Sequence, residues 1–206
     1  MSSNLQTNPT PDTPQSKTVA EKLLNVLLIA AVVFFALVLL VKGFFVSNVL
    51  VKQESMSPTL ADGQTIWVSK TAKVDRGDIV VFFTEDVQAK FLAGFLGNSE
   101  KYVKRVVAVE GDKVWAEQTA DGYVFKVLPS NSTQVLAEDY YTYKGVAVTI
   151  HATDVLGEFM EEHVGQENAL TIPQDTMFVL GDNRNNSTDS RALGAIPTSR
   201  LFGVLI

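Results

Sequence analysis

The sequence predicts a mostly β protein, in which an antiparallel β domain carries an inserted smaller β region and follows one N-terminal transmembrane helix. Three observations predict this fold class. A single uncharged apolar stretch lies near the N-terminus, short β-branched and aromatic runs recur after it, and no long helical periodicity occurs among those runs.

The N-terminal part of the chain changes abruptly in composition. Residues 1–22 are rich in Ser, Thr, Asn, Gln and Pro, so they bury too little apolar surface to offset the entropy of ordering, and we expect a disordered tail. Residues 23–41 carry no charge and match the length that a bilayer core requires. A cleaved secretory signal usually has a shorter apolar region and ends in small residues. Because this stretch is longer and is followed by Lys42-Gly43-Phe44-Phe45, we favour a membrane anchor over a cleaved signal.

Positive charges do not orient this anchor. Lys17 and Lys22 precede the apolar stretch, while Lys42 and Lys52 follow it. The excess of Lys and Arg that marks a cytoplasmic flank is therefore nearly balanced, and charge alone leaves the topology open.

Beyond the anchor, short runs with high β propensity are separated by Gly, Asp and Asn turns. We expect residues 42–112 and 172–206 to form the main β domain, and the acidic, motif-poor residues 113–171 to form an insertion or cap region. The predicted strands are Ile66–Val68, Ile79–Phe83, Tyr102–Val109, Tyr123–Val127, Val146–Ile150 and Met177–Leu180.

Composition excludes several functions. The net charge is −6 and the 17 basic residues are spread along the chain, so we expect no nucleic-acid partner. The chain has no cysteine, which excludes disulfides, thiolate catalysis and cysteine-based zinc sites.

A serine nucleophile is the best candidate for chemistry. Pro58 fixes its own backbone angle and restricts Ser57, so the loop that carries Ser55 and Met56 is held in few conformations. Serine must pass its proton to a nearby base. We interpret both histidines, His151 and His163, as solvent-exposed polar residues of the insertion, because neither lies in a motif.

Lys104 is the alternative base. In an alternating strand, Tyr102, Lys104, Val106 and Ala108 share one face, and Val103, Arg105, Val107 and Val109 share the other. Burial among apolar neighbours lowers a lysine pKa, and neutrality near pH 7 requires about three units, or roughly 4 kcal/mol of desolvation. A solvated strand lysine is the commoner case, so this argument alone does not select Lys104.

Four segments in order behind the anchor resemble the boxes of type I signal peptidases. SMSPTL at 55–60 looks like the serine box, YVKRVVAVEGD at 102–112 looks like the lysine box, and GDNRNNSTDSR at 181–191 looks like the third box. The run RGDIVVF at 76–82 also matches a box that lies between the first two. The similarity extends from the anchor to about Asp112 and from about residue 172 to 206. The compact size is closer to the Gram-positive branch of that family.

The resemblance implies roles for individual residues. Ser55 would be the nucleophile, Met56 would support its loop, and Lys104 would be the general base. Ser187 would hydrogen-bond and orient the lysine. The pairs that would brace the site are Asp182 with Arg105, on the face away from the nucleophile, and Asp189 with Arg191.

One position departs from the family pattern. The oxyanion hole is implied to use the backbone N–H of the nucleophile and, in some members, a serine two residues before it, where this chain has Gln53. Two interpretations stay open: the Gln53 amide donates to the oxyanion, or it points into solvent.

The implied activity is a membrane-bound serine endopeptidase with a Ser-Lys dyad and an acyl-enzyme, which removes signal peptides from exported preproteins at Ala-X-Ala sites. The implied location is the cell membrane, with a cytoplasmic N-terminal tail and an extracytoplasmic catalytic domain. Preproteins would bind as an extended strand. Membrane lipid is a second expected partner, and the protein export machinery is a further candidate. The Phe91–Gly97 segment either enters the membrane interface or forms an ordinary buried turn.

We expect no cofactor and no metal. Acidic and amide residues alternate between Asp182 and Asp189, but Arg184 stands where a calcium ligand would be needed, and no terminal glutamate follows.

Three other functions are disfavoured. Self-cleaving Ser-Lys repressor proteases carry DNA-binding modules, and no helix-turn-helix pattern precedes the serine box. A penicillin-binding enzyme needs an S-x-x-K motif, which this chain lacks. A non-catalytic, membrane-anchored binding protein on the same fold would be expected to lose Ser55 or Lys104.

Overall fold

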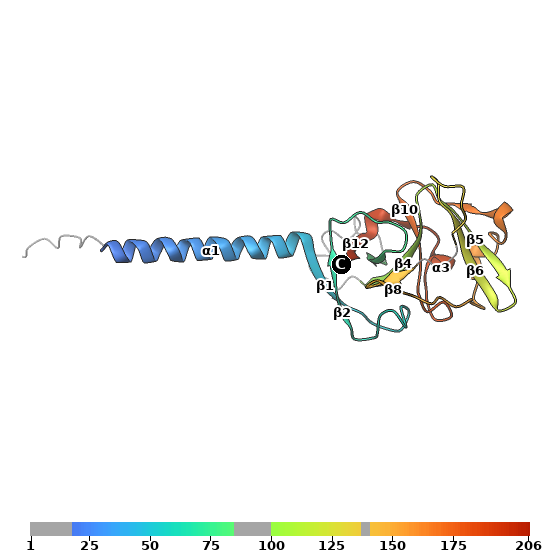
Figure 1. Ribbon diagram of the computed structural model, residues 1–206, viewed down its shortest axis with the longest axis horizontal. Helices are drawn as coiled ribbons and strands as arrows, with labels where there is room; N and C mark the ends of the chain where they lie inside the picture. Colours follow the sequence, from blue (N-terminus) through green and yellow to red (C-terminus); the bar gives the residue numbers. More distant parts are fainter. Residues whose placement is uncertain (1–17, 85–99, 137–140) are drawn as a thin grey trace, which may run out of the picture. The chain divides into compact units, whose positions relative to one another are not determined.

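The computed structural model describes residues 18–84, 100–136 and 141–206 (Figure 1). It divides into two compact units at the boundary between Lys42 and Gly43, and each is described by itself. The Phe91–Gly97 segment, which was expected at a membrane interface or in a buried turn, lies outside the described residues.

The first unit is built around helix α1, Val19–Phe45, whose last residues belong to the second unit. Thr18 and Glu21 form a reciprocal cap: the Thr18 N–H donates to Glu21 Oε2 at 3.0 Å, and the Glu21 N–H donates to Thr18 Oγ1 at 3.3 Å. This cap starts the helix at Val19, so residues 19–22, which were predicted to belong to a disordered tail, are helical. The helix also continues past residue 41, the predicted end of the membrane span.

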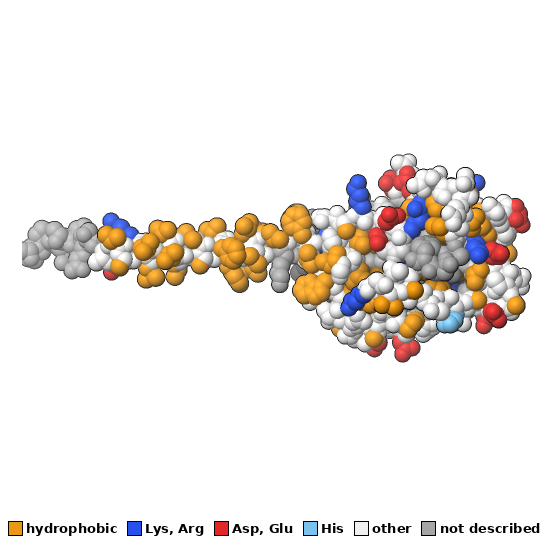
Figure 2. All heavy atoms as spheres, viewed as in Figure 1, with side chains coloured by type: hydrophobic (Ala, Val, Ile, Leu, Met, Phe, Trp, Pro, Cys, Tyr) orange, Lys and Arg blue, Asp and Glu red, His pale blue; other side chains and the backbone are white. Residues whose placement is uncertain are grey.

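Helix α1 is long and apolar enough to cross a membrane. Its 27 residues correspond to about 40 Å at 1.5 Å per residue, more than a hydrocarbon core of about 30 Å. Hydrophobic side chains are exposed along its length, and they cover most of the face seen in Figure 2. Such a helix is typical of a lipid environment.

The second unit contains a seven-stranded sheet in the order β1-β2-β12-β3-β4-β10-β11, in which every neighbouring pair is antiparallel. Its strands are β1 Val46–Leu50, β2 Thr65–Ser69, β3 Ile79–Phe83, β4 Lys101–Val109, β10 Thr176–Leu180, β11 Ile196–Pro197 and β12 Leu201–Leu205. Short helices α3 (Ser190–Leu193) and η5 (Thr198–Arg200) lie between its last strands.

The insertion forms a smaller three-stranded sheet in the order β6-β5-β9, together with a two-stranded ribbon of β7 and β8. These strands are β5 Lys113–Thr119, β6 Gly122–Leu128, β7 Thr142–Tyr143, β8 Val146–Ala147 and β9 Leu170–Thr171. Two single-turn helices, η3 (Glu158–Met160) and η4 (Gln166–Asn168), complete it. The predicted fold class, mostly antiparallel β behind an N-terminal apolar helix, is confirmed.

The insertion shares a hydrophobic core with the main sheet. Val107 and Phe178 of the main sheet belong to the same buried cluster as Phe125, Met160 and Val114 of the insertion. Residues 43–206 therefore form one compact unit, and the insertion is attached to the strand that carries Lys104.

A β-bulge in β4 changes which of its residues share a face, compared with the prediction. Phe178 pairs with Ala108 and Val179 pairs with Val106, so Val107 is the extra residue. Val107 and Ala108 consequently pack in the same cluster, although strict alternation would put them on opposite faces. The expected alternation holds only up to Val106.

Five of the six predicted strands form with ends within one residue of the expected ones, and the sixth shortens to Val146–Ala147. Strand β12 was missed partly because Gly203 weakens its pattern. A Cβ at Gly203 would lie 2.8 Å from the carbonyl oxygen of Ser69, so the close approach of β12 to β2 requires glycine.

Candidate active site

Ser55 lies in the loop between β1 and β2, and the apolar side chains beside it fix that loop. Met56 and Leu60 are buried in the cluster under β2 and β3, at 1% and 0% exposure, and the Leu60 N–H donates to the Met56 carbonyl at 2.9 Å. Met56 therefore anchors the nucleophile loop from below, which leaves Ser55 at the surface of a cleft.

The third box holds the backbone of the same loop. The Asn183 N–H donates to the Ser55 carbonyl at 3.0 Å, and Asn183 Nδ2 donates to the Glu54 carbonyl at 3.1 Å. Gly181 packs so closely here that a Cβ would lie 2.5 Å from the Ser55 carbonyl oxygen and 2.2 Å from Ser187 Oγ. Only glycine lets these two loops meet at this distance.

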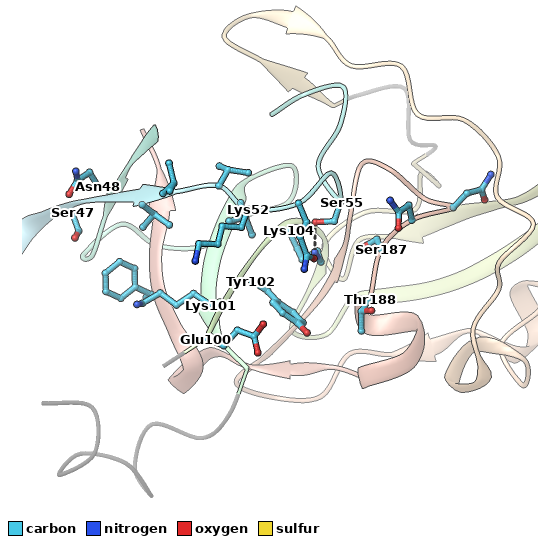
Figure 3. A pocket seen from close by; sticks show the side chains of 18 residues that line it. Ser47, Asn48, Lys52, Ser55, Glu100, Lys101, Tyr102, Lys104, Ser187 and Thr188 are labelled. Atoms are coloured by element: carbon cyan, nitrogen blue, oxygen red, sulfur yellow. Dashed lines mark hydrogen bonds between the residues drawn. The ribbon is translucent and has the colours of Figure 1, made fainter. Parts of the chain in front are cut away.

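Lys104 projects from β4 directly at the nucleophile. Its Nζ donates to Ser55 Oγ at 2.7 Å, and the side chain is only 4% exposed (Figure 3). The ammonium also lies 5.2 Å from the ring centroid of Tyr102, within range of a cation–π contact. A serine hydroxyl and a buried amine are thus in direct contact across 49 residues of sequence.

Burial changes the acidity of this lysine. Desolvation is the largest effect and lowers the pKa of Lys104 to about 8. The carboxylates of Asp189 and Asp182 act in the opposite direction, and the Arg191 guanidinium adds to the lowering. About one molecule in ten then carries a neutral Lys104 at pH 7, which is the form that accepts a proton.

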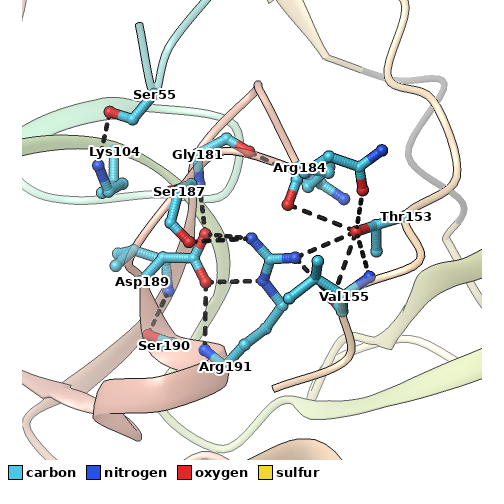
Figure 4. Close-up of polar contacts among 12 residues, drawn as sticks. Ser55, Lys104, Thr153, Val155, Gly181, Arg184, Ser187, Asp189, Ser190 and Arg191 are labelled. Atoms are coloured by element: carbon cyan, nitrogen blue, oxygen red, sulfur yellow. Dashed lines mark hydrogen bonds and ion pairs between the residues drawn. The ribbon is translucent and has the colours of Figure 1, made fainter. Parts of the chain in front are cut away.

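Two buried ion pairs flank the lysine. Arg105 donates to both oxygens of Asp182 at 2.8 and 2.7 Å, and both side chains are fully buried. Arg191 donates likewise to Asp189 at 2.8 and 2.9 Å (Figure 4). Burial alone raises the pKa of Asp189, but hydrogen bonds and charge from Arg191 outweigh it and hold that pKa below its ordinary value.

Ser187 lines the same cleft as Ser55 and Lys104, but the structure does not form the expected hydrogen bond to the lysine. Among the described residues, no hydrogen bond joins its buried hydroxyl to Lys104. The hydroxyl instead lies beside Asp189 and helps to lower the pKa of that carboxyl. The orienting role of Ser187 stays a prediction.

Gln53 also lines the cleft, with a left-handed backbone at φ 71°. Its N–H donates to Asp62 Oδ1 at 2.8 Å, which holds this uncommon conformation. The two interpretations of its side chain, oxyanion donor or solvated amide, are not separated by these contacts.

The cleft has a volume of about 770 Å³ and is bordered by β1, by the first half of β4 and by residues 185–188. Strand β1 pairs only with β2, and residues 101–104 of β4 pair only with β3, within the described parts of the chain. Each border strand therefore presents an unpaired backbone edge, to which an extended peptide can add by main-chain hydrogen bonds.

The histidines lie apart from this chemistry. His163 Nδ1 contacts the Asn168 carbonyl at 2.8 Å. His151 is exposed and lines a second pocket, separate from the cleft that Ser55 and Lys104 line. In the described ranges, no group of three His, Cys, Asp or Glu side chains could hold a metal ion.

Sequence reasoning missed three residues that the structure adds to the site. Gly181 and Asn183 lie inside the third box, and their place in that motif is the signal that could have identified them. Thr153 lies in the motif-poor insertion and contacts Arg191. No local pattern marks it, because its importance comes only from long-range contacts.

Comparisons with known proteins identify the family of this chain. The family model described as "Signal peptidase, peptidase S26" matches residues 23–206. Signal peptidase IB of Staphylococcus aureus is 31% identical over 182 residues, which cover 85% of this chain and 84% of that protein. Signal peptidase I P of Bacillus subtilis subsp. natto is 30% identical over 166 residues, 79% of this chain and 75% of that protein. A crystal structure of a signal peptidase I from Enterococcus faecalis V583 aligns at 26% identity and a TM-score of 0.39, over 66% of this chain and 98% of that one. The family model covers residues 23–206, and the two relatives are 31% and 30% identical to this chain. This protein therefore belongs to the signal peptidase family, peptidase S26.

Proposed function

We propose that this protein is a membrane-anchored endopeptidase that removes signal peptides from exported preproteins, with Ser55 as nucleophile and Lys104 as general base. The observation that carries the proposal is the 2.7 Å contact between Lys104 Nζ and Ser55 Oγ, made by a lysine that is 4% exposed. Burial supplies the neutral amine that an activated serine requires.

The reaction follows from this pair. Neutral Lys104 accepts the Ser55 proton while Oγ attacks the scissile carbonyl, and the resulting ammonium returns the proton to the leaving amine. The signal peptide stays bound as an acyl-enzyme, and a water molecule activated by Lys104 hydrolyses the ester. The proposed oxyanion donors are the backbone N–H of Ser55 and the side-chain amide of Gln53.

The ion pairs take no part in proton transfer in this proposal. Arg105–Asp182 and Asp189–Arg191 hold the third box against the nucleophile loop, and Ser187 orients Lys104 when substrate is bound. Their support is the burial of both pairs and the position of Ser187 in the cleft.

The proposed substrate lies extended in the cleft, with small residues at the third and first positions before the cut. Extended binding is favoured because the cleft-side edges of β1 and β4 pair with no other strand among the described residues. We further propose that the N-terminus is cytoplasmic and the β domain extracytoplasmic. Ser55 follows the end of α1 by only ten residues, which limits their separation to about 35 Å and suits a substrate held in the membrane.

Cleavage of a full-length preprotein with an Ala-X-Ala site tests this function. Detergent-solubilised parent protein should cut after the second Ala, while Ser55→Ala, Lys104→Arg and Lys104→Met should all be silent. Arginine keeps the charge but does not release its proton at working pH, and methionine keeps the approximate volume without an amine.

Lys101→Met is the matched control. Lys101 lies in the same strand and cleft, but its ammonium stacks on Phe83 and Phe202 rather than contacting Ser55. We expect at least half of the parent rate. Full activity of Lys104→Arg would refute the dyad, and inactivity of the parent on several preproteins would favour a non-catalytic binding protein.

A further inference from the structure

Residues 153–157 of the insertion contact Arg191 of the active site. Arg191, which pairs with Asp189, donates from Nη1 to the Val155 carbonyl at 2.7 Å and to Thr153 Oγ1 at 3.3 Å. Gly157 packs against the same arginine so tightly that a Cβ would lie 2.5 Å from Arg191 Cβ. The brace of the catalytic site is thus held partly by the insertion.

The Thr153 hydroxyl is the centre of these contacts. It donates to Asn185 Oδ1 at 2.7 Å and accepts from the Val155 N–H at 3.0 Å and from Arg191 Nη1 (Figure 4). Longer contacts to the carbonyls of Arg184 and Val155, at 3.4 and 3.3 Å, compete for the same proton. A hydroxyl offers one donor and two acceptor sites, so all three are used.

The two partners lie on either side of Ser187 in the chain. Asn185 precedes it by two residues and lines the catalytic cleft, and its Oδ1 also accepts from the Asp154 N–H at 3.2 Å. Arg191 follows it by four residues and donates from Nη2 to the Ser187 carbonyl at 3.4 Å. A single buried hydroxyl therefore connects both ends of the segment that carries Ser187 and Asp189.

Thr153 is itself held rigidly. Its backbone exchanges two hydrogen bonds with Tyr123 of β6, at 2.8 and 2.9 Å, and its side chain is fully buried. A Cβ at Gly122 would lie 2.7 Å from the Thr153 carbonyl oxygen, so β6 approaches closely there. The position of the hydroxyl is consequently set by the core that the insertion shares with β4 and β10.

We propose that Thr153 is a positioning residue for proteolysis: its hydroxyl fixes Asn185 and Arg191, and through them the segment of residues 185–191 that faces the nucleophile. This inference rests on the proposed Ser55–Lys104 dyad and gives the insertion a role in catalysis.

The test compares Thr153→Val, which removes the hydroxyl at nearly constant volume, with Thr153→Ser, which keeps it. Thr119→Val is the matched control, because Thr119 belongs to the same insertion but donates to the Gly122 carbonyl at the β5–β6 turn. We measure kcat/KM on the preprotein, the pH profile and the melting temperature. Thr153→Val should lower kcat/KM about tenfold, and the other two variants should stay within about twofold of the parent.

The pH profile separates positioning from a loss of folded protein. A smaller active fraction scales the rate equally at every pH. Loosened Arg191, whose charge lowers the pKa of Lys104, instead shifts the acidic limb of the profile to higher pH.

A double-mutant cycle with Asn185→Ala adds a second readout. If Thr153 acts through Asn185, the double variant should be much less impaired than the product of the two single effects.

Two outcomes would overturn the inference. If Thr153→Val matches the parent while Ser55→Ala is silent, the dyad stands and the positioning role is wrong. If Thr153→Ser is as slow as Thr153→Val with unchanged melting temperatures, the hydroxyl is not the group that acts.

Discussion

The acidity of Lys104 predicts how the cleavage rate depends on pH. With a pKa of about 8, the neutral fraction rises from about 1% at pH 6 to about 50% at pH 8. If Lys104 is the base, kcat/KM should rise about 50-fold over this interval and level off near pH 9. The cause is burial, which disfavours the ammonium by about 3 kcal/mol relative to an ordinary lysine.

Initial rates at low preprotein concentration measure kcat/KM and therefore report the free enzyme. The decisive interval lies between pH 9 and pH 10. A lysine with a pKa of about 8 is already neutral there and predicts a flat profile, whereas an unshifted lysine predicts a rise of about eightfold. Lys101→Met should follow the parent profile. Such a rise above pH 9, or a rate independent of pH between 6 and 8, would refute the reasoning.

Three further predictions concern the residues around Lys104. Lys104→Met should stabilise the fold at pH 7 by up to about 3 kcal/mol, because the parent buries an ammonium that the unfolded chain solvates. Lys104 of the unfolded chain holds its proton more tightly than buried Lys104, so the parent protein gains stability as pH rises from 8 to 10.5. The melting temperatures of the parent and of Lys104→Met should therefore converge near pH 10.5. Gly181→Ala should lower kcat about 100-fold with little change in circular dichroism, since its Cβ would displace Ser187 and the Ser55 carbonyl; a rate within threefold of the parent would contradict this packing argument. Asp182→Ala should reduce the free energy of unfolding in urea by about 3–5 kcal/mol, because it leaves buried Arg105 without its carboxylate, and a loss below about 1 kcal/mol would show that the pair contributes little.

Much of the fold could be predicted because its signals are local. An uncharged apolar stretch has few structures other than a membrane helix, and β-branched runs between turn residues predict strands with little help from the rest of the chain. The helix boundary at Val19 was missed although Thr18 and Glu21 carry a recognisable capping pattern. Strand β1 was missed because its residues directly follow the apolar stretch and contain Ser47 and Asn48.

The predictions for the active-site residues had mixed outcomes. Ser55 and Lys104 were found by resemblance to a family, and the structure brings them to 2.7 Å. Strict alternation along β4 failed at Val107, because a bulge depends on how the partner strand β10 packs, and the sequence of β4 does not contain that information. The expected contact between Ser187 and Lys104 is likewise not formed, since the hydroxyl lies beside buried Asp189.

The sequence by itself determined the long apolar N-terminal helix, the mostly β class and the four segments that carry the candidate chemistry, because each depends on neighbours within a few residues. Only the tertiary structure decided that Lys104 is buried, that Asn183 and Gly181 hold the Ser55 loop, and that the insertion reaches Arg191 through Thr153. These properties arise from desolvation and from close contact between residues far apart in the chain, such as Glu54 and Asn183, which are 129 residues apart. Such contacts exist only once the chain has folded.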